Sequence, residues 1–264
     1  MNVVVVLKFL VNFLWRFIFH SSPVNNNTST TLLGSLMELI RPLRLILLGA
    51  PGSGKGTQTG KLLKDFPSLK QISSGDILRY HVNVGTKIGQ EAEGYMRQGQ
   101  LIPDNNIINL ISQDMKNKGF LNERASWLLD GFPRSFNQAV KLRELLLQHN
   151  AALNLVVELD VDKKTLLERV EARWIHPASG RVYTVDYMPP KVPFKDDVTG
   201  DPLIKRPDDT AVIFEKRLNK YDQEIEPIRQ FYEKENILHK ILGNESDYLY
   251  PKLKELVLEK FGAF

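Results

Sequence analysis

The stretch that decides the fold is GAPGSGKGT, residues 49–57. An apolar run, residues 43–48, precedes it, and a helix-like segment, residues 58–65, follows it. A strand, a glycine-rich turn and a helix in this order predict a phosphate-binding loop. Without a Cβ, glycine lets backbone N–H groups converge on phosphate oxygens, and the helix adds partial positive charge at its N-terminus. A plain strand-to-helix turn is the simpler alternative, but the fixed spacings and the lysine disfavour it.

Lys55 supplies this loop with a mobile full charge for the terminal phosphates of a nucleotide. The usual pattern continues with Ser or Thr directly after the lysine. Here Gly56 takes that place, and the hydroxyl comes one residue later, on Thr57. We therefore expect Thr57 to hold a phosphate oxygen rather than to ligate Mg²⁺ directly.

Length and composition narrow the class of protein. The chain has 264 residues, a net charge of +4 and no cysteine. That length suits one α/β core with an appended small domain. The positive charge suits phosphate-bearing ligands but is too diffuse to indicate a nucleic-acid partner. The absence of cysteine excludes disulfides, thiolate metal sites and a cysteine nucleophile.

The N-terminal segment, residues 1–37, is expected to lie outside the fold. Lys8, Asn12 and Arg16 interrupt an otherwise apolar run at intervals of four residues, so they share one helix face. A basic stripe on an apolar helix, followed by the flexible residues 21–35, is typical of an organelle presequence. A membrane signal-anchor is the alternative, although charges within a run of barely spanning length disfavour it. We therefore expect no stable membrane association after targeting.

The rest of the chain alternates short apolar runs with segments of helical period. Strands are expected at residues 43–48, 71–74, 127–130, 153–159 and 237–242. Helices are expected at residues 58–65, 137–149, 162–173 and 250–261, and from about residues 75, 103 and 208 onward. This order predicts a parallel sheet with helices on both faces, whose ligands bind beyond the carboxyl ends of the strands. The loop at Gly49, the turn at Ser74, Asp130 and Arg134 all fall at that edge.

Residues 174–209 interrupt the alternation. They are polar and rich in turn signals, with a β-like patch at residues 181–185 and no run long enough for a core helix. We expect them to form an inserted small β domain.

Four stretches, in this order, resemble the adenylate kinase family of nucleoside monophosphate kinases. They are GAPGSGKGTQ (49–58), SGDILR (74–79), DGFPR (130–134) and the insert that begins RWIHP (173–177). The insert, read on to Tyr183, is most similar to that of the mitochondrial matrix branch, which transfers phosphate from GTP or ITP to AMP. The resemblance implies a reversible, Mg²⁺-dependent, monomeric transferase of the mitochondrial matrix that makes GDP and ADP.

The resemblance also implies a division of the chain. The P-loop core would comprise residues 38–72, 103–171 and 210–264, with a helical AMP-binding domain at residues 73–102 and a β lid at residues 172–209. In the lid, polar residues stand where some relatives have zinc-binding cysteines: His176, Ser179, Asp196 and Thr199. Because hydroxyls are poor zinc ligands, we expect a hydrogen-bonded network there, no structural zinc, and a structural role for His176.

Site residues follow from the same resemblance. The expected donor-nucleotide contacts are Gly52, Ser53, Gly54, Lys55, Gly56, Thr57, Arg173, Val182 and Tyr183. The expected AMP contacts are Ser74, Arg79, Gln100, Leu101, Ile102, Gly131, Phe132, Pro133, Arg134, Gln138, Arg206 and Arg217. Asp130 is expected to hold Mg²⁺ through water. Backbone near residues 243–245 aligns more loosely with the far side of the donor-base pocket.

The chemistry of such a site needs positive charge rather than a general base. A nucleotide phosphate is already an anionic nucleophile, so the difficulty lies in bringing two polyanions together. Guanidinium forks and a lysine supply charge where it develops in the transferred group. The expected catalytic residues are Lys55, Arg134, Arg169, Arg173, Arg206 and Arg217.

Three alternatives stay open. The donor could be ATP, since a few hydrogen bonds decide the base. A GTP-binding switch protein is disfavoured, because residues 117–120, NKGF, lack the Asp of the usual guanine-reading motif. A nucleotide-binding module without catalysis would be expected to have lost some of the arginines.

Overall fold

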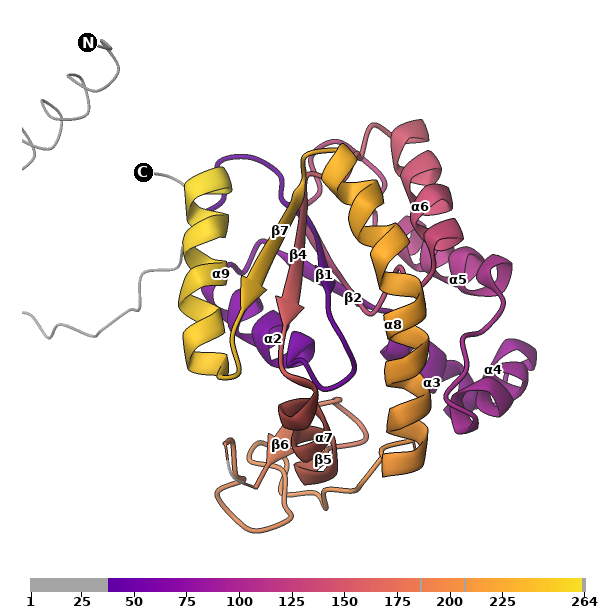
Figure 1. The fold of residues 1–264 in the computed structure, drawn as a ribbon, viewed down its shortest axis with the longest axis vertical. Coiled ribbons are helices and arrows are strands. Elements are labelled where there is room, and N and C mark those ends of the chain that lie inside the picture. The colour runs from indigo at the N-terminus through magenta and orange to yellow at the C-terminus, as the bar shows by residue number, and fades with distance from the viewer. Residues whose placement is uncertain (1–37, 186, 207, 263–264) are drawn as a thin grey trace, which may run out of the picture. The chain divides into compact units, whose positions relative to one another are not determined.

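The structure is a computed structural model that describes residues 38–185, 187–206 and 208–262. A five-stranded sheet, all of it parallel, runs through the centre in the order β2-β3-β1-β4-β7 (Figure 1). Its strands are β1 (Arg44–Leu48), β2 (Lys70–Ser73), β3 (Trp127–Asp130), β4 (Leu155–Asp160) and β7 (Leu238–Leu242). The predicted α/β class with a parallel sheet is confirmed.

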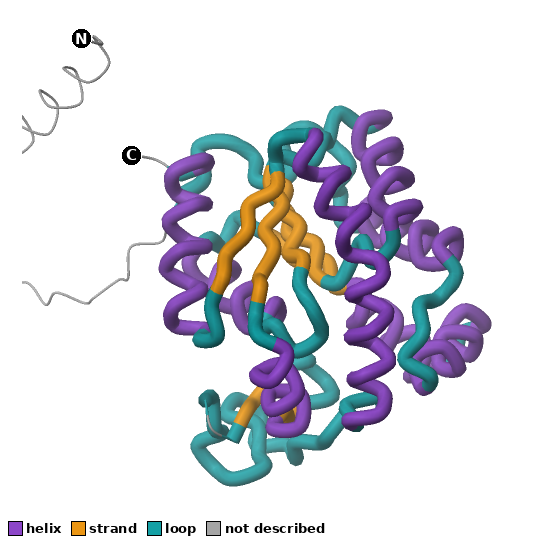
Figure 2. The backbone as a smooth tube through the Cα atoms, viewed as in Figure 1, coloured by secondary structure: helices purple, strands orange, loops and turns teal. Residues whose placement is uncertain are grey.

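Helices cover both faces of the sheet (Figures 1 and 2). On one face lie α2 (Lys55–Asp65) and α9 (Ser246–Phe261), and on the other lie α5 (Asp104–Asn117), α6 (Phe136–Gln148) and α8 (Ala211–Lys234). Successive residues of a strand point to opposite faces, so β1 contributes to both layers. Leu45 packs in the cluster with α2 and α9, while Ile46 packs in the cluster with α5, α6 and α8. Burial on both faces explains why β1 is apolar almost throughout.

Three further segments lie near the carboxyl edge of the sheet. Helices α3 (Ser74–Val84) and α4 (Lys87–Arg97) connect β2 to α5. Helix α7 (Lys163–Ala172) leads from β4 into an antiparallel pair, β5 (Arg173–Ile175) and β6 (Val182–Thr184). The described remainder of the insert is loop with isolated bridges, among them Lys195 with Pro202. The insert is therefore β-structured as expected, although its strands are only three residues long.

Helix starts differ most from expectation. Helix α2 begins at Lys55 rather than residue 58, because Gly54 adopts a left-handed conformation (φ 87°) that lets the helix begin directly after the loop. Helix α9 begins at Ser246 rather than residue 250, although Pro251 lies inside it. Burial of Ser246 and Leu249 against the core outweighs the backbone bond that Pro251 cannot donate.

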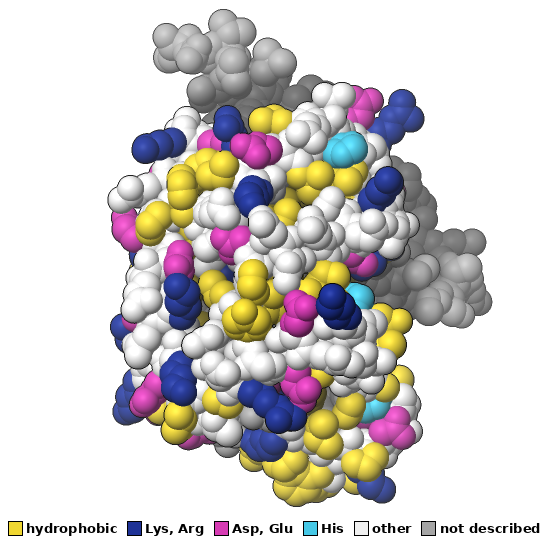
Figure 3. Space-filling model, turned by 90° about the vertical axis from the view of Figure 1, so that its right-hand side faces the viewer, with side chains coloured by type: hydrophobic (Ala, Val, Ile, Leu, Met, Phe, Trp, Pro, Cys, Tyr) yellow, Lys and Arg dark blue, Asp and Glu magenta, His cyan; other side chains and the backbone are white. Residues whose placement is uncertain are grey.

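Three observations bear on location and partners. The predicted presequence, residues 1–37, lies outside the described residues. Within the described part of the chain, no helix combines the length and apolarity needed to cross a bilayer. On the face drawn in Figure 3, basic and acidic side chains are interspersed rather than separated into fields of one sign. That face agrees with the diffuse charge of the sequence.

The two-sided burial of β1 leads to a stability prediction. Leu45 is fully buried on this central strand, so Leu45→Ala should leave a cavity and lower the free energy of unfolding by about 2–5 kcal/mol. Urea unfolding followed by circular dichroism measures the change. Ile40→Ala serves as control, because Ile40 is 66% exposed and its truncation should change the free energy little. Equal losses in the two variants would contradict this account of the core.

Candidate active site

A cavity of about 940 Å³ opens where strands β1, β2 and β3 end. Every residue that the sequence analysis assigned to the donor, AMP, catalytic or metal site lines this cavity. These residues come from segments far apart in the sequence. They meet in space because parallel strands bring their carboxyl ends to one edge of the sheet. The structure thus brings the whole predicted set together, and the individual roles stay predictions.

The phosphate loop is closely packed against the backbone of β4 and α7. Gly49 and Gly52 have φ values of 148° and 82°. A Cβ on Gly49 would lie 2.8 Å from the Leu159 carbonyl oxygen, and one on Gly52 would lie 2.7 Å from that of Leu166. Gly54 precedes α2 and offers no side-chain cap, so the first N–H groups of this helix have no side-chain partner there. That arrangement suits an anion at the helix N-terminus.

Lys55 points back over this loop. Its Nζ donates to the carbonyl oxygens of Gly49 at 2.8 Å and Ala50 at 3.0 Å. Burial lowers the pKa of Lys55 to about 8, opposed by the nearby Asp130 carboxylate. A bound phosphate would raise the pKa of this lysine again, because an adjacent anion favours the charged form.

The arginines lie close enough to perturb each other. Arg134 is reached by water from the cavity, yet the enclosing protein and then Arg217 lower its pKa to about 10. Burial, followed by Arg79 and Arg173, also lowers the pKa of Arg206 to about 10. The buried Nε of Arg206 has no hydrogen-bond partner among the described residues. Repulsion among these guanidinium groups would be relieved by a bound polyanion, so it indicates a polyanion-binding site.

The Ser74 side of the cavity is built from the ends of β2 and β3. Ser73, not Ser74, caps α3, since its side chain accepts a bond from the Asp76 N–H. Ser74 is thereby left to donate to the carbonyl oxygen of Gly131 at 2.7 Å. Gly131 has φ 76°, and a Cβ there would lie 2.8 Å from the Ser74 hydroxyl. The glycine is required for this close approach.

Two carboxylates that the sequence analysis did not assign hold two of the arginines. Asp208 pairs with Arg217, and Asp209 accepts from Arg173 Nε at 2.7 Å. Arg169 donates to the backbone carbonyl of Asn244, which ties α7 to the loop after β7. The adjacent Asp pair just before the long helix was the only sequence signal for these partners, and it does not reveal which arginine each would meet.

The family comparison agrees with this geometry. The adenylate kinase family model matches residues 47–237. The chain belongs to the adenylate kinase family. It is therefore a phosphotransferase of the nucleoside monophosphate kinase type, as the resemblance predicted.

Relatives support the same assignment. Two Saccharomyces cerevisiae proteins, the second from strain ATCC 204508 / S288c, are both named mitochondrial GTP:AMP phosphotransferase. The first is 54% identical over 227 residues, or 86% of this chain and 97% of that protein. The second is also 54% identical, over 81% of this chain and 96% of that protein. An adenylate kinase of Vanderwaltozyma polyspora is 44% identical over 74% of this chain and 86% of its own length.

The position of Asp130 is compatible with the predicted role in holding Mg²⁺. It ends β3 at the cavity wall, and no hydrogen bond within the described residues uses its carboxylate. Burial raises the pKa of Asp130, opposed by Lys55 and Arg134. A free carboxylate oxygen is a ligand, or a partner for a ligand water, that Mg²⁺ prefers. Among the described residues, no group of three or more His, Cys, Asp or Glu side chains could hold a metal ion.

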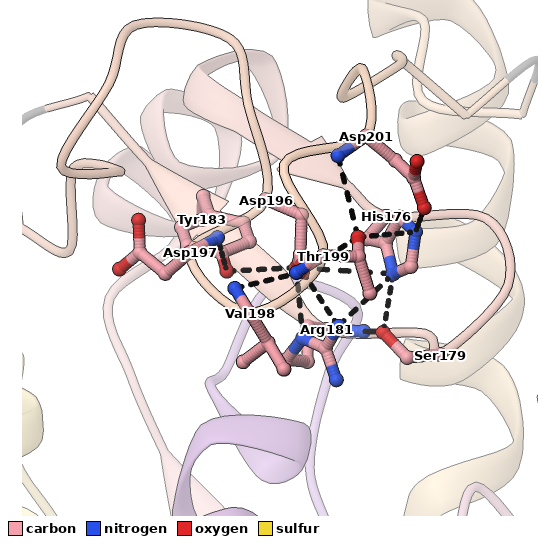
Figure 4. A network of polar contacts seen from close by, with 9 residues as sticks. All are labelled: His176, Ser179, Arg181, Tyr183, Asp196, Asp197, Val198, Thr199 and Asp201. Atoms are coloured by element: carbon pink, nitrogen blue, oxygen red, sulfur yellow. Dashed lines mark hydrogen bonds and ion pairs between the residues drawn. The ribbon is translucent and has the colours of Figure 1, made fainter.

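The insert of this adenylate kinase contains the expected polar network (Figure 4). Asp196 is its centre: the carboxylate accepts from Arg181 at 2.6 and 2.7 Å and from the Tyr183 hydroxyl at 2.8 Å. The Thr199 hydroxyl adds a bond at 3.1 Å. The hydrogen bonds from Arg181 and from the other donors to Asp196 hold the pKa of Asp196 well below the usual range. His176 joins through Ser179 at 2.7 Å and Asp201 at 3.0 Å.

This network also limits what Tyr183 can offer a nucleotide. Its hydroxyl donates to Asp196 and accepts from the Asp197 N–H at 2.9 Å, and only 7% of the residue is exposed. Both the donor and an acceptor position of the hydroxyl are therefore used within the insert. Contact with a donor base, as predicted for Tyr183 and Val182, would use the ring edge or the backbone of β6.

The network leads to a prediction about the insert. Asp196→Asn should speed proteolytic cleavage within residues 176–201, because an amide cannot accept from all the donors that converge there. Limited proteolysis with mass spectrometry locates and times the cuts. Asp197→Asn is the matched control, since that neighbouring residue is exposed and its carboxylate accepts one backbone bond, from Lys191. Unchanged cleavage in Asp196→Asn would contradict the central role of this carboxylate.

Proposed function

We propose that this adenylate kinase transfers the terminal phosphoryl group of GTP, or of ITP, to AMP, reversibly and with Mg²⁺. One observation carries the proposal: the phosphate loop and all the predicted arginines line one continuous cavity. The yeast relatives named GTP:AMP phosphotransferase, 54% identical to this chain, support GTP as the donor.

We propose that the cavity holds two nucleotides, one at each end. At one end, the phosphate loop, Lys55 and the arginines Arg169 and Arg173 would hold the donor phosphates, with β6 near the donor base. At the other end, Ser74, Arg79 and Gln138 would hold AMP. Arg134 would also contact AMP, and Arg206 and Arg217 would bridge the two sets of phosphates. The electrostatic effects among these arginines support this arrangement.

The reaction then needs no general base. An oxygen of the AMP phosphate bonds to the terminal phosphorus of the donor, and the bond from that phosphorus to its bridging oxygen breaks. Lys55 and the arginines stabilise the negative charge that spreads over the transferred group. Asp130 would hold Mg²⁺ through water, and the cation would supply positive charge that offsets the charge of the donor phosphates.

The protein must also keep water from the donor phosphate, because hydrolysis competes with transfer. We propose that residues 73–102, which form α3 and α4, act as an AMP-binding domain and that residues 172–209 act as a lid. Closure of the two over the core, residues 38–72, 103–171 and 210–264, would exclude water. We further propose that the enzyme is a monomer.

The mitochondrial location predicted from the basic N-terminus agrees with the two yeast relatives, whose names place them in mitochondria. We propose the matrix as the compartment. The GTP-binding switch and the non-catalytic module are disfavoured by membership in a kinase family and by the full set of arginines at the cavity. ATP as the donor is the alternative that experiment must separate.

A donor comparison tests the proposed function. The full chain with Mg²⁺ and AMP should turn over faster with GTP or ITP than with ATP, measured as ADP formed by chromatography. Faster turnover with ATP would keep the fold and the mechanism but overturn the donor assignment. No transfer from any of the three would overturn the proposed function.

A second prediction tests the phosphate loop. Lys55→Met should lower transfer by about 100-fold or more, because it removes a preorganised charge from the transferred phosphate. The folded state should persist, since burial already disfavours the charged form of Lys55. Steady-state kinetics and thermal unfolding give the two readouts. Lys116→Met, on the exposed face of α5, is the matched control. Near-normal turnover in Lys55→Met would overturn the mechanism.

A further inference from the structure

The carboxamide of Gln138 is held in one orientation. The residue is 2% exposed and lines the cavity at the proposed AMP end. Its Oε1 accepts from the backbone N–H of Arg134 at 2.8 Å. Its Nε2 donates to Oδ1 of Asp104 at 2.7 Å.

These two partners decide which way the carboxamide points. A backbone N–H can only donate, and an ionised carboxylate can only accept. Turning the amide of Gln138 by 180° would set N–H against N–H at Arg134 and oxygen against oxygen at Asp104. Both contacts would become repulsive, and buried polar groups would be left unpaired.

Asp104 is itself firmly placed. It lies in the first turn of α5, where a negative charge is favoured by the helix dipole. It accepts from the Ser135 hydroxyl at 3.1 Å and from Asn137 at 2.8 Å, both at the start of α6. Burial acts to raise the pKa of Asp104, but the bonds from Asn137, Gln138 and Ser135 outweigh it and hold the pKa below its usual value. The carboxylate therefore stays ionised at neutral pH.

The bound carboxamide of Gln138 keeps one lone pair on Oε1 and one hydrogen on Nε2. An acceptor beside a donor matches the 6-amino group and N1 of adenine, which present a donor beside an acceptor. Hypoxanthine and guanine carry an oxygen at position 6 and a hydrogen on N1, so their pattern is reversed. A 6-oxopurine would meet this carboxamide with both pairs mismatched.

We propose that Asp104 is a positioning residue that selects the acceptor base: it locks Gln138 in the orientation that accepts a 6-aminopurine monophosphate and rejects 6-oxopurine monophosphates. This inference rests on the proposed function, because it places the acceptor nucleotide at Gln138. It explains how one enzyme could take a 6-oxopurine as donor and still refuse it as acceptor. Asp104 does not line the cavity, so it would affect base selection only through Gln138.

The test compares AMP with IMP as acceptors for the wild-type protein and Asp104→Asn, each with its best donor. The asparagine amide can donate as well as accept, so one of the two constraints on Gln138 is lost. Because a hydrogen bond to a charged group is being replaced, the ratio of kcat/KM for AMP to that for IMP should fall by about 10-fold or more. The KM for the donor should stay unchanged. Asp114→Asn, on the same helix, is the matched control: its partner is Lys118, and it does not line the cavity.

The outcomes separate the possible failures. Equal loss of activity toward AMP and IMP would mean a merely structural role and would overturn the inference. A wild-type enzyme that phosphorylates AMP and IMP equally would overturn the inference but leave the kinase proposal intact. No phosphorylation of AMP from any donor would overturn both. If Asp104→Asn fails to fold, Asp104→Ser replaces it, because a hydroxyl also donates or accepts, and the same fall in the ratio is expected.

Discussion

Repulsion among positive charges at one edge of the sheet is the constraint on which the site depends. Lys55, Arg134 and Arg206 all have pKa values lowered by burial, with further lowering from neighbouring cations. Such a cluster persists only where rigid elements hold it and nearby carboxylates offset part of the charge. The central strands provide the rigid edge, and Asp130, Asp208 and Asp209 provide the partial compensation. Phosphate-bearing ligands would supply the remaining negative charge. The site is therefore electrostatically preorganised for them.

The parts that the sequence made predictable are those that follow directly from a strand end. Residues 43–58 show a strand, a turn and a helix in one continuous stretch, and Asp130 and Arg134 follow the next buried run. Once the sheet is parallel, topology alone brings these separate stretches to one edge. Topology therefore predicts that Lys55, Asp130 and Arg134 share one site, whereas the assignment of Arg217, which lies within α8, depends on the family resemblance.

The carboxylate partners of the arginines were not predictable, although Asp208 and Arg217 are only 9 residues apart. The structure pairs Asp208 with Arg217 and Asp209 with Arg173. The sequence does not predict this pairing, because it is equally compatible with the reverse one. The start of α9 was missed for a related reason: Pro251 marks a helix boundary locally, and only tertiary burial of the preceding turn overrides it. Sequence patterns report local preference, whereas these features are decided by packing between elements.

Two carboxylates that do not line the cavity, one in the insert and one next to Gln138, order their surroundings in the same way. An ionised carboxylate accepts hydrogen bonds and never donates them, so it imposes a direction on every group around it. In the insert, Asp196 fixes Arg181 and Tyr183 and so gives rigidity to a segment with little regular structure. Beside the cavity, Asp104 fixes the amide of Gln138, so that the carboxamide presents a single donor and acceptor pattern there. A serine or asparagine in either place would satisfy some of the same neighbours but would leave the direction open. Each of these two carboxylates fixes the orientation of its neighbours because it can only accept hydrogen bonds, whatever their number.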